Sequence, residues 1–469
     1  MSNRIKFNRQ GELEFKASSL KITQKYYKKY ERISQIINEN PEIVETVHRD
    51  LLKVFGAQKG KKQGRKPKFT SETILRVLIV KHLENLGYRG AVIRIDDSEF
   101  LRRFVGLGLK LMMDYSTLCD MFKAIQPQTW KKVNDILTAY AQETGKISGD
   151  KLRRDTTVVE ANIHYPTDSG LLWDTYRVLG RFIDKVRQVD DTLVGQNRLQ
   201  MKKVKKLYMQ INRQSSKSAK APKRLKSLYK PLIGHVENIL IWADQVCEGI
   251  HQERTDYTWE VDAYLLKLRQ EYKKYIPLGI QVVNQARRRV FDGEQVPNEE
   301  KIFSLFEPHV ELIKRGKAGK PIEFGHVVNI QQVKEKFITG YDVFKTKPVE
   351  HSLVDPSLAK HQKSFGRLPE IYADDKGAYQ SMAKLYELEK KIPMVAIGKK
   401  GKRNRQEQAR ENDPLFKLAQ KFRAGIEGSI SFLKRIFGLA KCFYKGWKSF
   451  QAGVGSVVFC HNLVILSRE

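Results

Sequence analysis

The stretch Lys151-Leu-Arg-Arg-Asp-Thr-Thr-Val-Val-Glu160 decides the fold class of this chain. It is the first segment with β character, because its run of Thr and Val favours an extended backbone, and it ends a long helical block. Further strand patterns lie at 324–330, 337–344, 370–374 and 394–397. Val333-Lys-Glu-Lys336 between the first two predicts a hairpin, and helical patterns at 357–363 and 380–389 separate the later strands. This order predicts an α/β layer, α+β overall, with helices packed on a mixed sheet.

The region before this strand, from residue 20 to about 135, has helical periodicity throughout. Two short helices, near 98–105 and 116–125, suit a helix-turn-helix-like unit, although any small helical bundle has the same pattern. The basic linker Lys59–Lys68 favours DNA binding by this region.

A second helical region, from 171 to about 306, interrupts the strand-forming parts of the chain. Within it, Thr192–Val236 contains twelve Lys or Arg and no Asp or Glu, and Ser215–Ser218 is expected to break the helix. A solvated helical face normally mixes both signs of charge, so this one-sided stretch favours a surface that follows a phosphate backbone. A basic loop at 399–405 has the same character. The candidate DNA-binding cations of these two stretches are Lys202, Lys203, Lys205, Lys206, Lys223, Arg224, Lys399, Lys400, Lys402 and Arg403.

Composition favours a polyanion as the partner. The 469 residues carry a formal net charge of +33, with 41% apolar and 30% charged residues, as expected of a globular protein that binds nucleic acid. No 18-residue apolar stretch and no secretory h-region occur, and the four cysteines lie far apart. We therefore expect a cytoplasmic protein with free thiols and no membrane partner.

Three acidic positions stand out against this basic background. Asp155 lies in the first strand, and Asp374-Asp375-Lys376-Gly377 lies where a later strand should end. In open α/β sheets the carboxyl ends of strands are where sites collect. Carboxylate oxygens at such places suit Mg²⁺ or Mn²⁺, and two such ions can activate an attacking oxygen and stabilise a leaving one.

The third position is on a predicted helix, Arg423-Ala-Gly-Ile-Glu427-Gly-Ser-Ile-Ser-Phe-Leu-Lys434. Helical geometry brings Arg423, Glu427 and Lys434 within about 40° of one another. An apolar stripe adjoins them, made of Phe422, Ile426, Ile430, Leu433, Ile436 and Phe437. The pattern suits a catalytic carboxylate flanked by two phosphate-binding cations, and it also suits an amphipathic helix with ordinary charge pairs.

Four blocks of the chain, in order, resemble bacterial insertion-sequence transposases of the DDE superfamily. The blocks are Arg154–Ser169, Glu323–Val328, Asp375–Gly377 with the Arg-x3-Glu-x6-Lys helix, and Gly438–Gly446. The closest similarity is to the branch whose last carboxylate is framed by Arg and Lys, of the ISNCY type. It extends over about residues 65 to 465.

This resemblance implies an RNase H-like catalytic core at 146–170 and 320–469, a helical DNA-binding domain at 1–145 and a basic helical insertion at 171–319. It implies Asp155, Asp375 and Glu427 as catalytic ligands of two Mg²⁺ or Mn²⁺ ions, with Asp374 as the alternate to Asp375. Arg423 and Lys434 would hold DNA phosphates. The branch often has a Tyr where this chain has Gln420; in relatives that Tyr contacts a terminal phosphate, so its replacement puts a hairpin route of end processing in doubt.

The function that the resemblance implies is metal-dependent cleavage at insertion-sequence ends followed by strand transfer into target DNA. Its partners would be terminal inverted repeats, target DNA and a second copy of the chain, as a homodimer or higher assembly, in a nucleoid-associated bacterial protein. Two alternatives remain open: a metal-dependent nuclease without strand transfer, and a catalytically silent DNA-binding protein derived from such an element.

Overall fold

The computed structural model describes residues 20–54, 68–214, 221–250, 257–314 and 321–468. These form two compact units, Met1–Asn162 with His326–Glu469, and Ile163–Gly325. Most of the basic linker (residues 59–67) and the helix break at 215–218 lie outside the described residues. The division of the chain into a DNA-binding domain, a catalytic core and an insertion stays a prediction about function.

The first unit is built around a mixed sheet, as the strand pattern predicted. Its strand order is β3-β1-β5-β6, with β4 paired to β3 and β7 paired to β1. The strands are β1 (Lys151–Ala161), β3 (Ile322–Val333), β4 (Ile338–Val343), β5 (Ile371–Ala373), β6 (Met394–Ala396) and β7 (Lys441–Cys442). β5 and β7 pair parallel to β1, β6 pairs parallel to β5, and β3 with β4 forms the predicted antiparallel hairpin. The two-residue strand β7 was not predicted.

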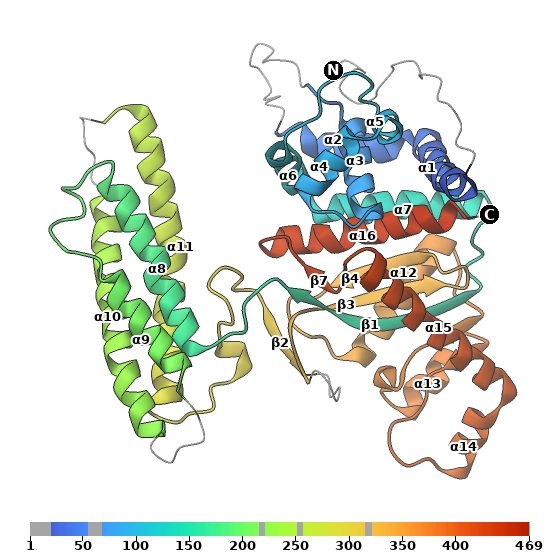
Figure 1. The fold of residues 1–469 in the computed structure, drawn as a ribbon. Helices are drawn as coiled ribbons and strands as arrows, with labels where there is room; N and C mark the ends of the chain where they lie inside the picture. The colour runs from blue at the N-terminus through green and yellow to red at the C-terminus, as the bar shows by residue number, and fades with distance from the viewer. Residues whose placement is uncertain (1–19, 55–67, 215–220, 251–256, 315–320, 469) are drawn as a thin grey trace. The chain divides into compact units, whose positions relative to one another are not determined.

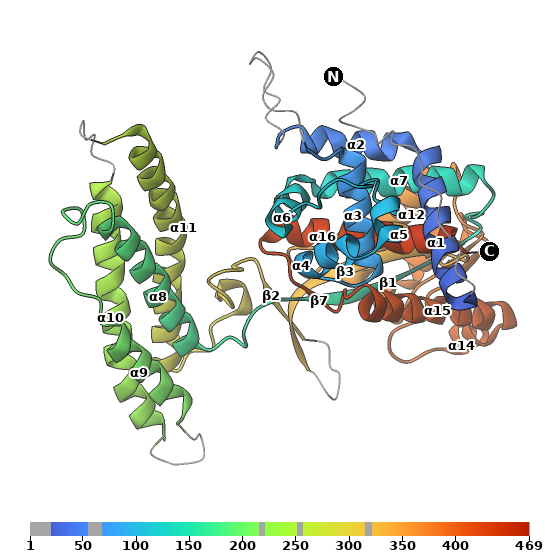
Figure 2. The ribbon, with the colours of Figure 1, turned by 45° about the horizontal axis from the view of Figure 1, so that its top comes forward.

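Helices cover this sheet and position the predicted site. α12 (Val354–Phe365) and α13 (Met382–Glu389) share a core with Leu152 of β1 and Tyr372 of β5. α15 (Pro414–Ile436) contacts β1, β5 and β6, and Figure 2 shows it running beside the sheet. Ile426, Leu433 and Phe437 of its apolar stripe are buried, but Ile436 is 46% exposed, so the predicted stripe is wrong at Ile436.

The N-terminal helices belong to the same compact unit as the sheet. They are α1 (Lys21–Glu39), α2 (Pro41–Leu51), α3 (Ser71–Leu83), α4 (Tyr88–Asp96), α5 (Glu99–Phe104), α6 (Tyr115–Ala124) and α7 (Pro127–Glu143). The two predicted short helices are confirmed as α5 and α6, which begin at the side-chain caps Ser98 and Asp114. α7 packs along α16 (Trp447–Leu466), and Figure 1 shows this pair between the other N-terminal helices and the sheet.

α16 is long and apolar enough to cross a membrane, judged by length and composition alone. However, 78% of its most apolar window is buried inside the structure. Its small residues allow close packing: a Cβ on Gly455 would overlap Tyr341 and lie 2.6 Å from Trp130. These contacts are those of a core helix in a globular unit.

A buried lysine ties the N-terminal helices to the last part of the chain. Lys81 of α3 donates to the Tyr444 hydroxyl at 2.7 Å, and its Nζ lies 5.2 Å from the ring centroid of Tyr88. Tyr444 in turn stacks on Phe122 of α6, with ring centroids 4.4 Å apart. Burial lowers the pKa of Lys81 to about 8.

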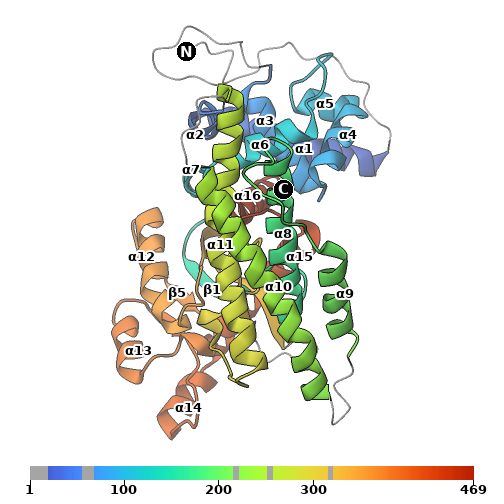
Figure 3. The same ribbon diagram turned by 90° about the vertical axis from the view of Figure 1, so that its left-hand side faces the viewer.

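The second unit is a helical bundle with its own apolar core, as the insertion was predicted to be. Its helices are α8 (Asp168–Arg187), α9 (Met201–Asn212), α10 (Ala221–Gly249) and α11 (Trp259–Val290). Figure 3 shows the two long helices α10 and α11 alongside each other. The bundle is followed by β2 (Glu311–Lys314), an unpredicted strand that pairs antiparallel with the first four residues of β3.

Replacing Lys81 with Met should change how stability depends on pH. Because the folded-state pKa of Lys81 is lowered from 10.5 to about 8, the unfolded chain holds more protons between these values and wild-type stability rises with pH there. Relative to Lys81→Met, the wild type should gain about 3 kcal/mol between pH 7.5 and 10.5. The difference in thermal unfolding between the two proteins across this range measures the effect, and a constant difference would show that Lys81 titrates normally.

Candidate active site

A buried ion pair joins β1 to the end of β5. Arg154 Nε lies 2.6 Å from Oδ2 of Asp374, and both side chains are only 1% exposed. The Tyr372 hydroxyl donates to the same carboxylate oxygen at 2.6 Å, and the Asp375 N–H donates to the other at 2.8 Å. Burial raises the pKa of Asp374 to about 6, while the hydrogen bonds and charge of Arg154 oppose this rise. Both oxygens of Asp374 are thus committed to holding the fold.

Asp155 and Asp375 each follow one member of this pair. Arg153 pairs with Ala373 in parallel register at the end of β5, and beyond this point the charge of Asp375 acts directly on Asp155. Successive side chains of an extended chain point to opposite faces, so these two carboxylates leave the face that Arg154 and Asp374 bury. Asp155 is 19% exposed and Asp375 is half-buried. Burial raises the pKa of Asp155 and the carboxylate of Asp375 raises it further, while the Thr156 N–H and Arg423 lower it.

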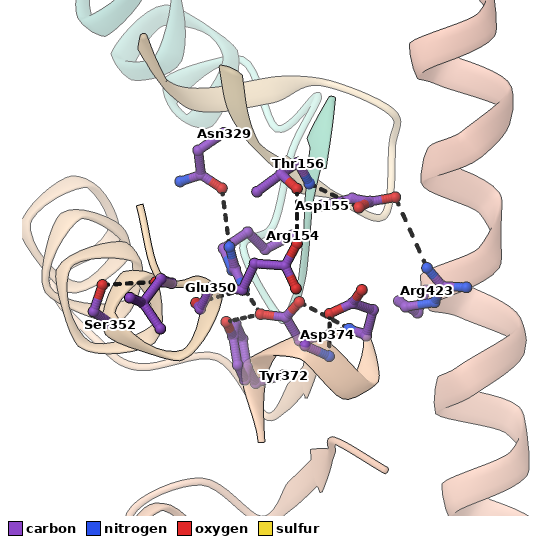
Figure 4. Close-up of polar contacts among 12 residues, drawn as sticks. Arg154, Asp155, Thr156, Asn329, Glu350, Ser352, Tyr372, Asp374 and Arg423 are labelled. Atoms are coloured by element: carbon purple, nitrogen blue, oxygen red, sulfur yellow. Dashed lines mark hydrogen bonds and ion pairs between the residues drawn. The ribbon is translucent and has the colours of Figure 1, made fainter. Parts of the chain in front are cut away.

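α15 brings the third predicted carboxylate to the same region, with an arginine in between. Arg423 Nη1 lies 3.8 Å from Oδ2 of Asp155, and its Nη2 lies 3.2 Å from Oε1 of Glu427. Figure 4 shows the Arg423 side chain extending from α15 toward Asp155. Glu427 is 65% exposed. In the described part of the chain, no three His, Cys, Asp or Glu side chains form a group that could hold a metal ion as they stand.

The register of α15 on the sheet is fixed by contacts on either side of Arg423. Gln420 Nε2 donates to the carbonyl of Ala396 at 2.6 Å and to that of Asp374 at 3.3 Å. Arg153 donates to the Phe422 carbonyl at 2.6 Å. A Cβ on Gly425 would overlap Arg153 Nη1, so glycine at this position leaves room for the guanidinium. Gln420 therefore ties the helix to the ends of β5 and β6.

The sequence reasoning missed Glu350, which lies in the 3₁₀ turn Glu350–Leu353 before α12. Its Oε1 accepts from the Thr156 hydroxyl at 3.4 Å, and its main-chain oxygen accepts from Arg154 at 3.2 Å. Figure 4 shows these contacts in the middle of the site. The one sequence signal for Glu350 was Gly377 in the run Asp375-Lys-Gly377. A residue without a side chain at this position leaves room for a neighbouring side chain.

The predicted DNA-binding cations differ in how they are paired. Lys399 lies 2.6 Å from Glu407, and Arg403 lies 2.7 Å from Glu411; both acids belong to helix α14 (Arg405–Asn412). Lys434 is half-buried on α15. The exposed members are Lys202, Lys203, Lys205 and Lys206 of α9, Lys223 and Arg224 of α10, and Lys400 and Lys402.

Comparison with known proteins gives one match. Residues 21–124, which form α1–α6, match the family model described as a transposase domain (DUF772). No curated protein and no solved structure matches the chain. The match supports membership of a transposase family, and this kind of protein binds DNA.

The two neighbouring aspartates should behave differently when replaced. Asp374→Ala leaves Arg154 buried without its counter-ion, so it should cost about 3–5 kcal/mol of stability. Asp375→Ala removes one cap contact to Gly377 and relieves repulsion with Asp155, so it should change stability by about 1 kcal/mol or less. Thermal denaturation of both variants tests the assignment. Equal losses would mean that Asp375 is as structural as Asp374.

Proposed function

We propose that this protein is a DDE transposase with an RNase H-like core, which cleaves DNA at element ends and joins them to target DNA with divalent cations. The observation that carries the proposal is the meeting of Asp155 and Asp375 beside β1 and β5, with Glu427 across Arg423. The strand arrangement supports it: β1 carries the first carboxylate, with an antiparallel hairpin on one side and two parallel strands on the other.

The donor set fits Mg²⁺ or Mn²⁺. Both ions prefer carboxylate oxygens and keep several sites for water and substrate. Burial raises the pKa of Asp155, and repulsion from Asp375 raises it further; a bound cation would relieve this repulsion. Glu427 joins Asp155 and Asp375 only if Arg423 moves from between them, and its 65% exposure leaves it free to reorient.

The roles of the chain's own residues follow from this arrangement. Asp155 and Asp375 would hold two cations, which when bound activate the attacking oxygen and stabilise the leaving one. Arg423 would exchange its carboxylate contacts for a DNA phosphate, an exchange of one anion for another that costs the guanidinium little. Gln420 and Arg153 keep α15 in register during this exchange, because their partners are main-chain carbonyls.

Two other functions use the same residues. A metal-dependent nuclease would cleave without joining, and a silent DNA-binding protein would do neither. The presence of all three carboxylates around one strand pair favours an enzyme over the silent protein.

Substitution of the carboxylates tests the chemistry. Asp155→Asn, Asp375→Asn and Glu427→Gln should each lower cleavage and joining of terminal-repeat DNA by about 10³-fold, since several kcal/mol of charge stabilisation are lost. The assay is gel analysis of cleaved and joined products with Mg²⁺ or Mn²⁺, with Glu370→Gln, whose side chain is 64% exposed, as the control. Full activity of all three variants would rule out the proposal, and cleavage without joined products in the wild type would favour the nuclease.

The basic face of α9 should contribute to DNA affinity through phosphate contacts. Replacing Lys202, Lys203, Lys205 and Lys206 together with Ala should weaken binding to any duplex sequence and reduce the slope of log K against log salt by as much as about 3 to 4. Fluorescence anisotropy at several salt concentrations measures this slope. Lys384→Ala with Lys391→Ala is the control, since both lysines already pair with Glu387. An unchanged slope would remove α9 from the DNA-binding surface.

A further inference from the structure

A fourth carboxylate lies against the site and has no role in the function proposed above. Glu350 comes from the segment between β4 and α12, remote in sequence from Asp155, Asp375 and Glu427. Its side chain is half-buried and, within the described residues, its one hydrogen-bonding partner is the Thr156 hydroxyl. No cation lies within ion-pair distance of it in that part of the chain.

Glu350 touches both chain segments that carry the candidate metal ligands. Through Oε1 it contacts Thr156, the residue after Asp155 on β1. Oε2 of Glu350 packs on Gly377. A Cβ added to Gly377 would overlap this oxygen, and the same Cβ would lie 2.8 Å from Oδ1 of Asp375. Oε2 of Glu350 and Oδ1 of Asp375 are therefore close neighbours, both next to the position that a Cβ of residue 377 would take.

Glycine at position 377 is required because it lets the Glu350 carboxylate come close. Its backbone conformation does not require glycine, since its φ is outside the left-handed region. Its N–H donates to Oδ1 of Asp375 at 2.8 Å, so the residue that makes room for Glu350 also orients Asp375. The main-chain oxygen of Glu350 accepts from Arg154, the guanidinium that pairs with Asp374. The segment is thus fixed at both its backbone and its side chain.

A carboxylate in this place has an electrostatic cost. It adds a negative charge next to that of Asp375, and the nearest arginine on β1, Arg154, is already paired with Asp374. A side chain that served only to fill space or to accept from Thr156 could be a neutral amide. The charge becomes favourable when a cation binds next to it.

We propose that Glu350 is a positioning residue of the active site: it holds the Asp375 turn against β1, and its negative charge strengthens cation binding by Asp155 and Asp375. This rests on the function proposed above. The role is exerted through Thr156 and Gly377, the neighbours of the two aspartates.

The test is Mn²⁺ binding to the full chain without DNA, measured by calorimetry and by the electron paramagnetic resonance of free Mn²⁺. Glu350→Gln preserves the shape and the contact with Thr156 but removes the charge, so its Kd for Mn²⁺ should rise about tenfold. Gly377→Ala, whose Cβ displaces the same carboxylate, should raise the Kd in the same direction. Glu370→Gln should leave the Kd unchanged, and thermal unfolding identifies any variant that fails to fold.

The outcomes separate this inference from the function on which it rests. If Asp155→Asn and Asp375→Asn lose Mn²⁺ binding while folded Glu350→Gln binds as the wild type does, the role of Glu350 is wrong and the site stands. If the two aspartate variants also bind as the wild type does, the metal site itself is wrong. A tenfold loss in Glu350→Gln together with loss in both aspartate variants supports the proposal.

Discussion

The candidate site depends on the buried ion pair between Arg154 and Asp374. Removing two charges from water is costly, and the pair is tolerated because Tyr372, the Asp375 N–H and Asn329 satisfy the remaining hydrogen-bonding groups. Each partner precedes a candidate ligand by one residue on neighbouring parallel strands. Because side chains alternate along extended chain, burying the pair on one face directs Asp155 and Asp375 to the other. The spacing of the two candidate ligands is thus a consequence of how the pair is packed.

The chain as a whole is positively charged, whereas the candidate site is negatively charged. The chain carries +33 overall, which draws DNA toward its surface from a distance. At the site itself, Asp155 and Asp375 place two negative charges close together, with Glu350 next to Asp375, and this charge opposes the approach of a phosphate. Arg423 supplies one positive charge by lying between Asp155 and Glu427. In the proposed function, this guanidinium and a divalent ion would be alternative partners for the same carboxylates, so the arrangement of α15 would be linked to cation binding.

Much of the fold could be predicted from the sequence, because its elements carry strong local signals. The Thr and Val run of β1, the hairpin β3–β4 and the capped helices α5 and α6 are confirmed. An element set by a distant contact was missed: β7 is two residues long and exists through its pairing to β1. The choice of Asp375 over Asp374 came from the resemblance and stays a prediction; the structure adds that Asp374 is engaged in a buried ion pair with Arg154, a long-range contact that the sequence does not reveal. Glu350 had no motif at all.

At position 420 this chain has Gln where the branch that it resembles often has Tyr. In the proposed function, this difference would affect how DNA is held and not which carboxylates bind the cations. The position is where the resembling branch often has Tyr, whose phenol has a single O–H to donate. The Gln420 amide has two N–H groups, and it uses them to bridge the carbonyls of Ala396 and Asp374 at the ends of two strands. A side chain engaged in this way is part of the frame that holds Arg423 and Glu427. In the proposed function, the carboxylates would carry the phosphodiester chemistry, while a group other than Gln420 would contact the DNA ends.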